Sequence, residues 1–432
     1  MAICDNVGKT EAGILTFAGQ NTVELAEKYG TPLYLMDEDK IREKMRRYKN
    51  AMKEYFGPES GPLYASKAAS FKRIYEIAKE EGIGIDVVSG GELYTALAAG
   101  FDVSNAFFHG NNKTYDEIKF AIESGIGYFV VDSLKELDEI NKEAERQKVK
   151  QKVLLRITPG IDSHTNKKIA TGNVDSKFGM AIATYQAHEF TYAALRCEWL
   201  ELCGYHCHVG SQVFVADVFE DAVDIMIDFA LEIKEKYDYE PQILNLGGGF
   251  GVRYVKSHPE LDIEKSIKDV ATALTEKCNA VGMTVPRVLM EPGRSIVADA
   301  GMTLYTAGVI KQITSFKNYL AIDGGMGDNP RFALYDAEYT VINASRAAKH
   351  PDYICSVVGK CCESGDIIQE GVNIAKPQKG DIIAVLTTGA YNYSMSSNYN
   401  RIPKPPVVML AGGESYVAVK RETYADVIRN DV

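Results

Sequence analysis

A chain of 432 residues with 46% hydrophobic content can bury a large core, and its length is typical of two domains. Its 48 basic and 59 acidic residues give a net charge of −11, which argues against nucleic acid or an anionic membrane as the main partner. No run is long enough to span a bilayer, and Met1 to Thr10 lack the apolar core of a signal peptide. The eight cysteines are therefore expected to be free thiols in a soluble, cytoplasmic protein.

The first two thirds of the chain alternate strand and helix patterns. Thr22 to Tyr29 is a helical segment that ends at Gly30, and Thr31 to Met36 has the pattern of a strand. Eight apolar runs follow, most of them separated by helical patterns: Leu63–Ala65, Ile85–Val88, Ala106–Phe108, Tyr128–Val131, Val153–Ile157, Leu202–Cys207, Ile243–Leu246 and Val288–Met290. This count favours an α/β (β/α)8 barrel over a doubly wound open sheet, which would show the same alternation.

Beyond Gly301 the pattern changes to short β-rich runs broken by Gly, Asp and Pro. It predicts a β-sandwich or open-barrel domain. The N-terminal residues are expected to join that domain, because Leu33–Met36 has no obvious strand position in the barrel. We therefore expect residues 1–36 to belong with the β-domain, a barrel over 37–300 and a C-terminal β-domain over 301–432.

Polar residues and glycines follow most of the predicted barrel strands. In a barrel these strand ends line one rim, where enzymes of this architecture keep their active sites. The segments are Lys67, Ser89-Gly-Gly91, His109-Gly-Asn111, Thr158-Pro-Gly160, His208-Val-Gly-Ser211, Gly247-Gly-Gly-Phe-Gly251 and Glu291-Pro-Gly-Arg294. Glycine is also a common turn residue, so it is the seven segments together that point to a functional rim.

Lys67 lies in Tyr64-Ala-Ser-Lys-Ala68, where the first barrel strand gives way to a helix. A lysine beside small residues at this position is expected to be poorly solvated, and a desolvated amine can form a Schiff base with a carbonyl. The pentapeptide alone favours a plainer interpretation, in which the lysine extends from a strand end into water.

Three further segments allow both a structural and a chemical interpretation. Gly247–Gly251 could bring backbone N–H groups close to a phosphate, or simply form a tight turn. His206 and His208 would share one face of a strand, and no second ligand pair at zinc spacing follows, so we expect no metal and a histidine that faces the barrel mouth. Glu291 could form a structural ion pair, or could pair with the protonated ring nitrogen of a pyridine cofactor.

Taken in order, the motifs resemble those of the pyridoxal-phosphate-dependent decarboxylases with the alanine racemase fold, and most closely the diaminopimelate decarboxylases. The matching segments are Tyr64–Ala68, His206–Ser211, Gly247–Gly251, Glu291–Arg294, Cys362-Glu-Ser-Gly-Asp366 and Gly389-Ala-Tyr391, with Pro159–His164, Thr171-Gly172, Asp175–Gly179 and Arg331–Tyr335. The resemblance covers nearly the whole chain. It implies that meso-2,6-diaminopimelate is decarboxylated to L-lysine and CO2, the last step of lysine biosynthesis, with pyridoxal 5'-phosphate as cofactor.

The resemblance also implies a role for each matching residue. Lys67 would carry the cofactor, His208 would stack on its ring, and Cys362 would be the proton donor. The remaining cofactor contacts would come from Ser211, Gly249, Glu291, Pro292, Gly293, Arg294 and Tyr391, with Glu291 on the ring nitrogen. Arg294 and Arg331, assisted by Tyr335 and Tyr391, would bind the distal carboxylate of the substrate, and Glu363 its distal ammonium.

Two residues limit the alternatives and two depart from the family pattern. Glu291 favours decarboxylation, because the racemases of this fold have a basic residue there, and Arg331 argues against the ornithine-specific relatives. Phe332 and Asn166 stand where the family commonly has proline and histidine, which leaves the loop geometry near Arg331 open. The alternatives are a decarboxylase of carboxynorspermidine, ornithine or arginine, and a non-catalytic regulatory protein that binds the cofactor.

The resemblance finally implies a homodimer with shared active sites. One subunit would supply Lys67, and the other the loop that bears Cys362 and Glu363.

Overall fold

The computed structural model describes residues 3–161 and 176–432, which fall into two compact units. The β-rich unit comprises Met1–Glu43, Val252–Pro259 and Ile296–Val432, and the barrel unit comprises Lys44–Gly251 and Glu260–Ser295. The expected barrel segment 37–300 therefore includes a short stretch, Val252–Pro259, that lies in the β-rich unit. Asp162 to His164, Asn166, Thr171-Gly172 and Asp175 lie outside the described residues. No helix among those described has the length and apolar character needed to cross a membrane.

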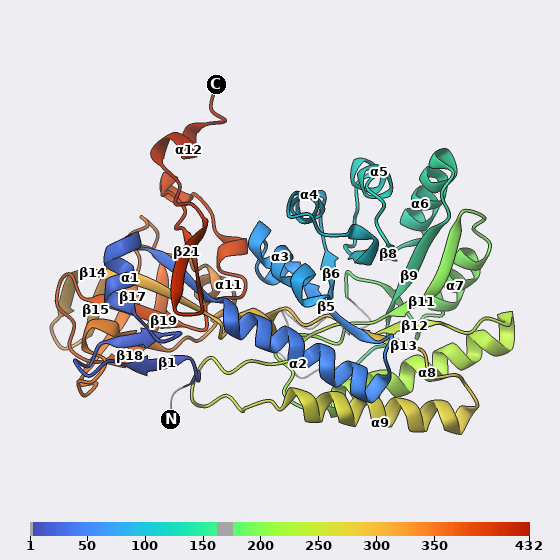
Figure 1. Cartoon of the computed structure of the whole chain (residues 1–432), viewed down its shortest axis with the longest axis horizontal. Helices are drawn as coiled ribbons and strands as arrows, with labels where there is room; N and C mark the ends of the chain where they lie inside the picture. The colour runs from blue at the N-terminus through green and yellow to red at the C-terminus, as the bar shows by residue number, and fades with distance from the viewer. Residues whose placement is uncertain (1–2, 162–175) are drawn as a thin grey trace. The chain divides into compact units, whose positions relative to one another are not determined.

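In the barrel unit, eight parallel strands of the described chain close into a ring (Figure 1). They are β5 (Gly61–Ala65), β6 (Gly84–Val87), β7 (Ala106–Phe108), β8 (Tyr128–Val131), β9 (Gln151–Thr158), β11 (Leu200–His206), β12 (Ile243–Asn245) and β13 (Arg287–Met290). Pairing of β8 with β9 and of β13 with β5 closes the ring, and β10 (Met180–Ala181) adds to β9. All eight predicted runs are strands, so the barrel is confirmed and the open sheet is wrong.

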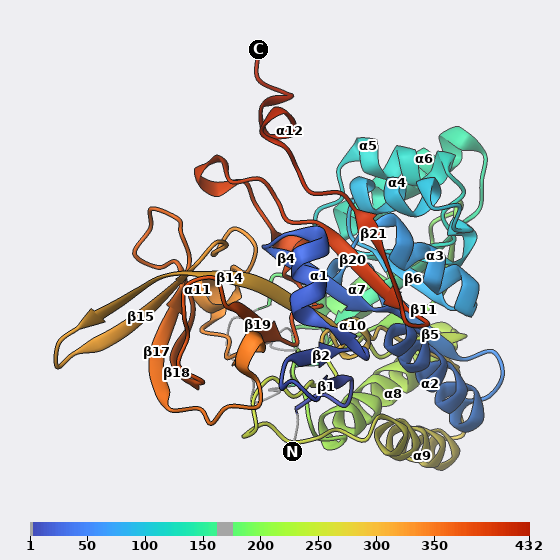
Figure 2. The same ribbon diagram turned by 60° about the vertical axis from the view of Figure 1, so that its left-hand side comes forward.

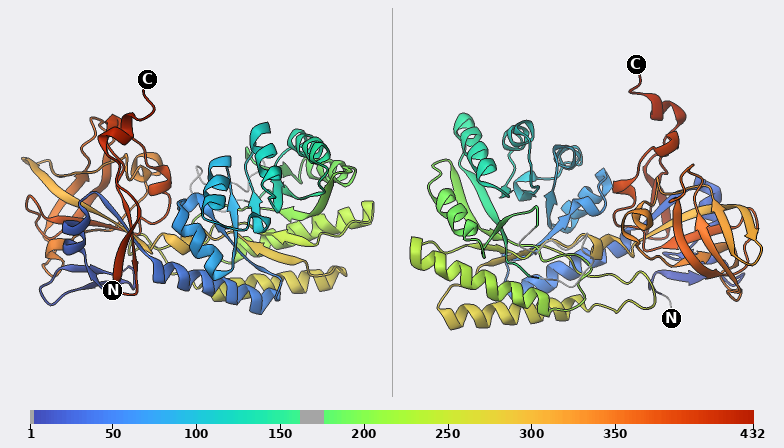
Figure 3. Two further views of the ribbon diagram at one scale, coloured as in Figure 1. Left: turned by 45° about the horizontal axis from the view of Figure 1, so that its top comes forward. Right: turned by 180° about the vertical axis from the view of Figure 1, so that it is seen from behind.

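Helices cover the outside of this ring (Figures 1 and 3). They are α3 (Lys72–Glu81), α4 (Gly90–Ala98), α5 (Tyr115–Glu123), α6 (Leu134–Gln147), α7 (Gln186–Leu195), α8 (Asp217–Tyr237) and α9 (Ile263–Val281). Helix α6 has Ser133 as its N-cap, because the Ser133 hydroxyl accepts the backbone N–H of Glu136. Inside the ring, Leu63, Phe107, Val130, Leu154, Cys203, Ile243 and Leu289 form an apolar cluster. These buried layers explain why the strands appear as short apolar runs in the sequence.

The β-rich unit contains a mixed sheet in the order β18-β17-β15-β14-β4-β20-β21, with β19 on β14 and β16 on β19. Its strands are β4 (Leu33–Asp37), β14 (Gly301–Ile313), β15 (Lys317–Ile322), β16 (Val341–Asn343), β17 (Tyr353–Val358), β18 (Ile367–Ile374), β19 (Ile382–Leu386), β20 (Val407–Ala411) and β21 (Glu414–Val419). The N-terminal strand β4 lies between β14, antiparallel, and β20, parallel (Figure 2). The expected union of the N-terminal segment with the β-domain is confirmed.

Smaller elements complete the β-rich unit. A second sheet is formed by β1 (Val7–Lys9), β2 (Leu15–Phe17) and β3 (Gln20–Asn21). Three helices of this part of the chain are α1 (Thr22–Tyr29), α11 (Arg331–Tyr335) and α12 (Tyr424–Ile428), and the short α10 (Arg294–Val297) joins the two units along the chain. Helix α1 has the predicted bounds and ends at Gly30.

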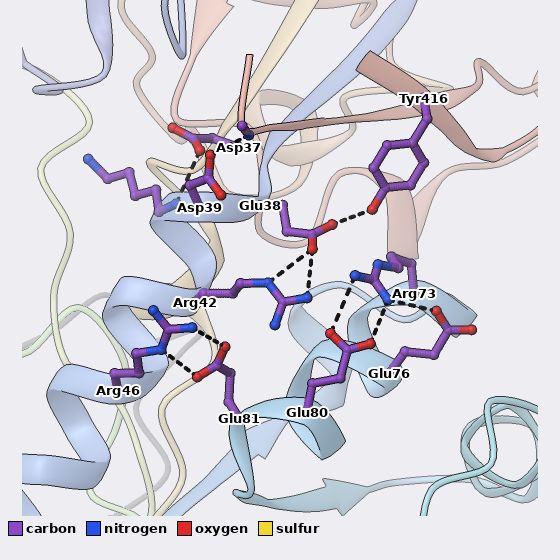
Figure 4. Close-up of polar contacts among 12 residues, drawn as sticks. Asp37, Glu38, Asp39, Arg42, Arg46, Arg73, Glu76, Glu80, Glu81 and Tyr416 are labelled. Carbon is purple, nitrogen blue, oxygen red and sulfur yellow. Dashed lines mark hydrogen bonds and ion pairs between the residues drawn. The ribbon is translucent and has the colours of Figure 1, made fainter. Parts of the chain in front are cut away.

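Helix α2 (Glu38–Phe56) begins in the β-rich unit and ends in the barrel unit, and contacts of its first turn and of its middle tie it to neighbouring elements (Figure 4). In the first turn the Glu38 carboxylate accepts hydrogen bonds from Arg42, at 2.7 Å, and from the Tyr416 hydroxyl on β21. In the barrel unit Arg46 binds Glu81 at the end of α3, with a closest distance of 2.6 Å. The helix is therefore tied to neighbouring elements over much of its length.

Candidate active site

Lys67 lies in a single 3-10 turn, Ser66–Ala68, between β5 and α3. The strand ends at Ala65 and the helix begins only at Lys72, so the expected direct passage from strand to helix is wrong by a few residues. Ser66 and Ala68 are buried, whereas the Lys67 side chain is exposed. The lysine thus extends from the strand end into solvent, as the plainer interpretation of the pentapeptide has it, and not into the poorly solvated position expected beside small residues.

Glu291 follows β13 and is the centre of a buried polar cluster in the barrel unit. The Asn245 side-chain amide donates to its Oε1 at 2.6 Å. Nε2 of His109 lies 2.9 Å from the same oxygen, and Nε2 of His206 lies 3.3 Å from Oε2. These partners come from β12, from the residue after β7 and from the last residue of β11. Three different strands thus fix the orientation of one carboxylate.

The electrostatics of this cluster keep Glu291 ionised. Burial alone would raise the pKa of its carboxyl, but His109 and His206 bring it well below the usual value. Burial lowers the pKa of His206 to about 4 and that of His109 below its usual value, so both rings are neutral at pH 7. Nε2 of His206 lies within hydrogen-bonding distance of the carboxylate. An ionised carboxylate in this position can pair with a cationic ring nitrogen.

Asp86, on β6, is a second buried acid of the barrel interior, and its pKa moves in the opposite direction. Burial, followed by repulsion from Glu291, raises the pKa of Asp86 well above its usual value. The same barrel interior thus favours the protonated form of Asp86 and the charged form of Glu291. Glu291, His109 and His206 also form a group whose possible metal-ligand atoms lie within 4.8 Å of one another. Within this group, Oε1 of Glu291 already accepts a hydrogen bond from the Asn245 side chain.

The loops after β11, β12 and β13 approach each other closely because of their glycines. A Cβ atom at Gly248 would lie 2.1 Å from the carbonyl oxygen of Glu291, and one at Gly249 would lie 2.2 Å from that of Gly210. The Gly248 N–H donates to Nδ1 of His208 at 3.2 Å, which orients that ring. Partial burial, followed by repulsion from Lys67 and Arg156, lowers the pKa of His208 well below its usual value, so the ring is neutral.

The turn after β13 connects this cradle to Lys67. The buried guanidinium of Arg294 donates to the Ser211 hydroxyl at 3.0 Å. A Cβ atom at Gly293 would lie 2.8 Å from Cβ of Ala65, and the Pro292 carbonyl accepts the Ala65 N–H at 3.2 Å. The structure therefore brings together the residues expected at the cofactor, namely Lys67, His208, Ser211, Gly249, Glu291, Pro292, Gly293 and Arg294.

These residues fit a phosphorylated pyridine cofactor. The fit rests on an ionised carboxylate for a ring nitrogen, a neutral imidazole, an arginine, and a glycine cradle that any larger residue would fill.

The remaining expected site residues belong to the β-rich unit. Arg331 begins α11 and is only 8% exposed, and its guanidinium carbon lies 5.3 Å from the ring centres of both Tyr335 and Tyr391. Its Nε has no hydrogen-bond partner among the described residues. A buried cation between two aromatic rings, with no ion pair in the described chain, is suited to a ligand carboxylate.

Cys362 and Glu363 are exposed on the loop between β17 and β18. They and Arg331, Tyr335 and Tyr391 lie in the β-rich unit, whereas Lys67 and Arg294 lie in the barrel unit. All eight cysteines, Cys362 included, are free thiols, as expected.

The sequence patterns indicated no individual role in the site for Asp86, His109 or Asn245. They raised His206 only as a possible metal ligand. Asp86 and Asn245 carried a recognisable signal, because each interrupts an otherwise apolar strand, in Ile85-Asp-Val-Val88 and Ile243-Leu-Asn-Leu246. A polar residue in a strand that is buried on both faces requires a partner inside the barrel.

Comparisons with known proteins give a consistent result. Residues 38–298 match the model of the pyridoxal-dependent decarboxylase family, pyridoxal binding domain. The chain is 45% identical to a diaminopimelate decarboxylase of Bacillus methanolicus over 95% of both chains. It is 44% identical to that of Halalkalibacterium halodurans, over 97% of this chain and 95% of the other. The crystal structure of the M. jannaschii diaminopimelate decarboxylase in complex with L-lysine superposes with a TM-score of 0.92 at 35% identity, over 100% of this chain and 99% of that one.

Proposed function

The chain belongs to the pyridoxal-dependent decarboxylases and, within them, to the diaminopimelate decarboxylases, and on this basis we propose that it converts meso-2,6-diaminopimelate to L-lysine and CO2. Pyridoxal 5'-phosphate is the cofactor that this family membership implies. The observation that carries the proposal is the buried, ionised Glu291, which is contacted by Asn245, His109 and His206.

The residues of the barrel unit account for binding and activation. Lys67 is exposed and can bond covalently to the cofactor's carbonyl carbon. Glu291 would hold a proton on the cofactor's ring nitrogen, and the neutral ring of His208 would pack on the cofactor's face. When bound, the cofactor supplies an electron-withdrawing ring that accepts the electron pair left by CO2. Ser211, Gly249 and Arg294 bind the phosphate region.

The residues of the β-rich unit account for substrate choice and the final proton. The substrate ends in a second amino-acid group, so its distal end carries both a carboxylate and an ammonium. Arg331 binds the carboxylate and Glu363 the ammonium, each through a charge-assisted hydrogen bond. The Cys362 thiol delivers the proton to the carbon that has lost CO2, and then takes one up from water.

A panel of substrates tests this proposal directly. CO2 release is measured with meso-diaminopimelate, ornithine, lysine, arginine and carboxynorspermidine under identical conditions. We expect meso-diaminopimelate to have the highest kcat/KM, because the other amino acids leave Arg331 buried without an anion. Faster release from ornithine or carboxynorspermidine would overturn the substrate assignment. No release from any substrate by the cofactor-loaded protein would favour the non-catalytic alternative.

The proposal extends to assembly and location. The working form is a two-fold homodimer in which Cys362 and Glu363 of one subunit serve the Lys67 of the other. Support comes from the exposed position of this loop in a unit different from that of Lys67. The eight free thiols support a reducing, cytoplasmic location.

Subunit exchange tests the shared site. Lys67→Ala and Cys362→Ala, each nearly inactive alone, are mixed under conditions in which subunits exchange. A mixed dimer then has one site with both lesions and one site with neither, so activity returns to roughly a quarter of wild type. If exchange is demonstrated and activity does not return, each loop serves its own subunit.

A further inference from the structure

The loop that carries Cys362 and Glu363 is held by hydrogen bonds from two successive backbone N–H groups to side chains. The Cys361 N–H donates to Oδ2 of Asp366 at 2.6 Å. Asp366 lies in the same loop, is buried, and accepts the Met326 N–H on its other oxygen. The Cys362 N–H donates to Oδ1 of Asn400 at 2.7 Å. The second bond is the unusual one, because it connects an exposed loop residue to a side chain 38 positions along the chain.

Asn400 occupies a turn that suits an asparagine. Its backbone has φ +53° and ψ +24°, in the left-handed region that glycine, asparagine and aspartate adopt most readily. The turn is tied in place by Asn398, whose amide donates to the Ile402 carbonyl at 3.1 Å and to the Glu422 carboxylate at 2.6 Å. The acceptor offered to Cys362 is therefore on a fixed support and not on a second mobile loop.

The residue before Asn400 faces the other functional side chain of the loop. The Tyr399 hydroxyl lies 3.5 Å from Oε2 of Glu363. Asn400 and Tyr399 thus contact Cys362 and Glu363, the two neighbouring residues that we place at the substrate. Cys362 and Glu363 themselves are exposed, so few packing contacts restrain their backbone.

We propose that Asn400 is a positioning residue for Cys362, and that its side-chain carbonyl fixes the peptide from which the thiol projects. This inference rests on the proposed role of Cys362 as proton donor. Proton delivery to one carbon requires a fixed distance and direction, and a loop without the bond would present the thiol in many orientations. Asn400 takes no part in the proton transfer.

Two substitutions separate the acceptor from the backbone conformation. Asn400→Gly keeps access to positive φ but removes the acceptor, and Asn400→Asp keeps both. Asn318→Ala is the matched control. The Asn318 amide donates to the Ile354 carbonyl at 2.9 Å on β17, the strand that leads into the same loop, so the control removes one asparagine-to-backbone bond at a different point of that strand.

The first measurement needs neither cofactor nor substrate. Amide hydrogen exchange of the cofactor-free full chain is followed by mass spectrometry at the resolution of Cys362. We expect this amide to exchange about tenfold faster in Asn400→Gly, and at the wild-type rate in Asn400→Asp and Asn318→Ala. An unchanged Cys362 amide in Asn400→Gly overturns the proposal.

The second measurement is turnover of meso-diaminopimelate by the cofactor-loaded variants. We expect kcat to fall about five- to tenfold in Asn400→Gly with KM within about twofold, and Asn400→Asp to restore kcat. If the Cys362 amide exchanges faster in Asn400→Gly but kcat is unchanged, Asn400 holds the loop without positioning the thiol. This result would overturn the inference and leave the proposed decarboxylation intact. If the unmodified protein releases no CO2, the proposed function fails, and the exchange result still decides whether Asn400 holds the loop.

Discussion

The barrel cluster and the Cys362 loop achieve fixed geometry by opposite means. Around Glu291 every partner comes from a strand or its immediate end, the groups are buried, and three side chains converge on one carboxylate. Around Cys362 the side chains are exposed, and the backbone N–H groups of Cys361 and Cys362 each donate one hydrogen bond to a side chain, that of Asp366 and that of Asn400. The first arrangement suits a charge that must persist, and the second suits a group that gains and loses a proton from water.

The contrast predicts different responses to substitution. A buried charge cluster fails as a unit, because removing one member leaves the others unpaired in a low dielectric. A loop whose backbone is held by individual hydrogen bonds should lose only about the free energy of one hydrogen bond with each substitution. The predictions below test this difference, beginning with the largest effect.

Lys67→Ala should have the largest effect. The substitution removes the amine to which the cofactor bonds, and we expect kcat to fall roughly ten-thousand-fold or more. Borohydride reduction of the loaded wild-type protein, followed by peptide mapping, should place the pyridoxyl group on Lys67. Exposed Lys72, five positions later, is a matched control, and Lys72→Ala should keep the label on Lys67. A pyridoxyl group on another lysine would refute the assignment of Lys67.

Glu291→Gln should have the next largest effect, because glutamine keeps the shape but removes the charge that holds the ring proton. We expect kcat to fall roughly a hundredfold or more, together with a changed absorption spectrum of the bound cofactor. Glu240→Gln is the control, because that carboxylate of the barrel unit binds Lys234 and lies outside the cluster. A wild-type spectrum and wild-type turnover in Glu291→Gln would mean that the cluster has no part in the reaction.

Arg331→Ala should weaken substrate recognition more than turnover. Loss of one charge-assisted contact of about 1.5–3 kcal/mol corresponds to a ten- to hundredfold fall in kcat/KM for meso-diaminopimelate. Ornithine, which has no distal carboxylate, should be affected far less, so the preference between the two substrates narrows. Arg331→Lys keeps the charge and should lose less. Equal losses for both substrates would indicate a structural role for Arg331.

Asp328→Asn should have the smallest effect on activity, and we expect it to change the stability of the protein instead. Burial raises the pKa of Asp328, in the β-rich unit, to about 7. The unfolded chain loses this proton near pH 4, so the folded state binds more protons between about pH 4 and 7, and its stability falls as the pH rises through that window. The free energy of unfolding of the variant should therefore exceed that of wild type by little at pH 4, and by up to roughly 4 kcal/mol at pH 8.

Urea unfolding at both pH values measures this difference. Asp352→Asn, an exposed carboxyl that accepts the Lys376 N–H, is the control and should show no comparable pH-dependent gain. Equal stability of Asp328→Asn and wild type at pH 8 would mean that Asp328 ionises without cost.

Local patterns in the sequence were sufficient to predict the barrel but not its polar interior. The eight strands were predictable because parallel strands covered by helices are apolar along their whole length. The strand β18 was not predicted, because Ile367–Ile374 is interrupted by Gly371 and only two of its eight residues are buried at this sheet edge. The contact of Asn400 with Cys362 was not predictable either, because no local pattern records a hydrogen bond between distant turns. The exposure of Lys67 depended on a 3-10 turn that small residues do not signal.

The position of β4 has a consequence for the newly made chain. This strand, Leu33–Asp37, is buried throughout and pairs with β14 and β20, the first of which begins roughly 260 residues later in the chain. At 5–20 residues per second, the ribosome needs roughly 15–50 s to deliver that partner. During this interval the barrel segment can emerge and fold, whereas an apolar strand with two unpaired edges waits for both neighbours. Synthesis of this protein thus leaves the first strand of its large mixed sheet without one of its two neighbours until β20, Val407–Ala411, has been made.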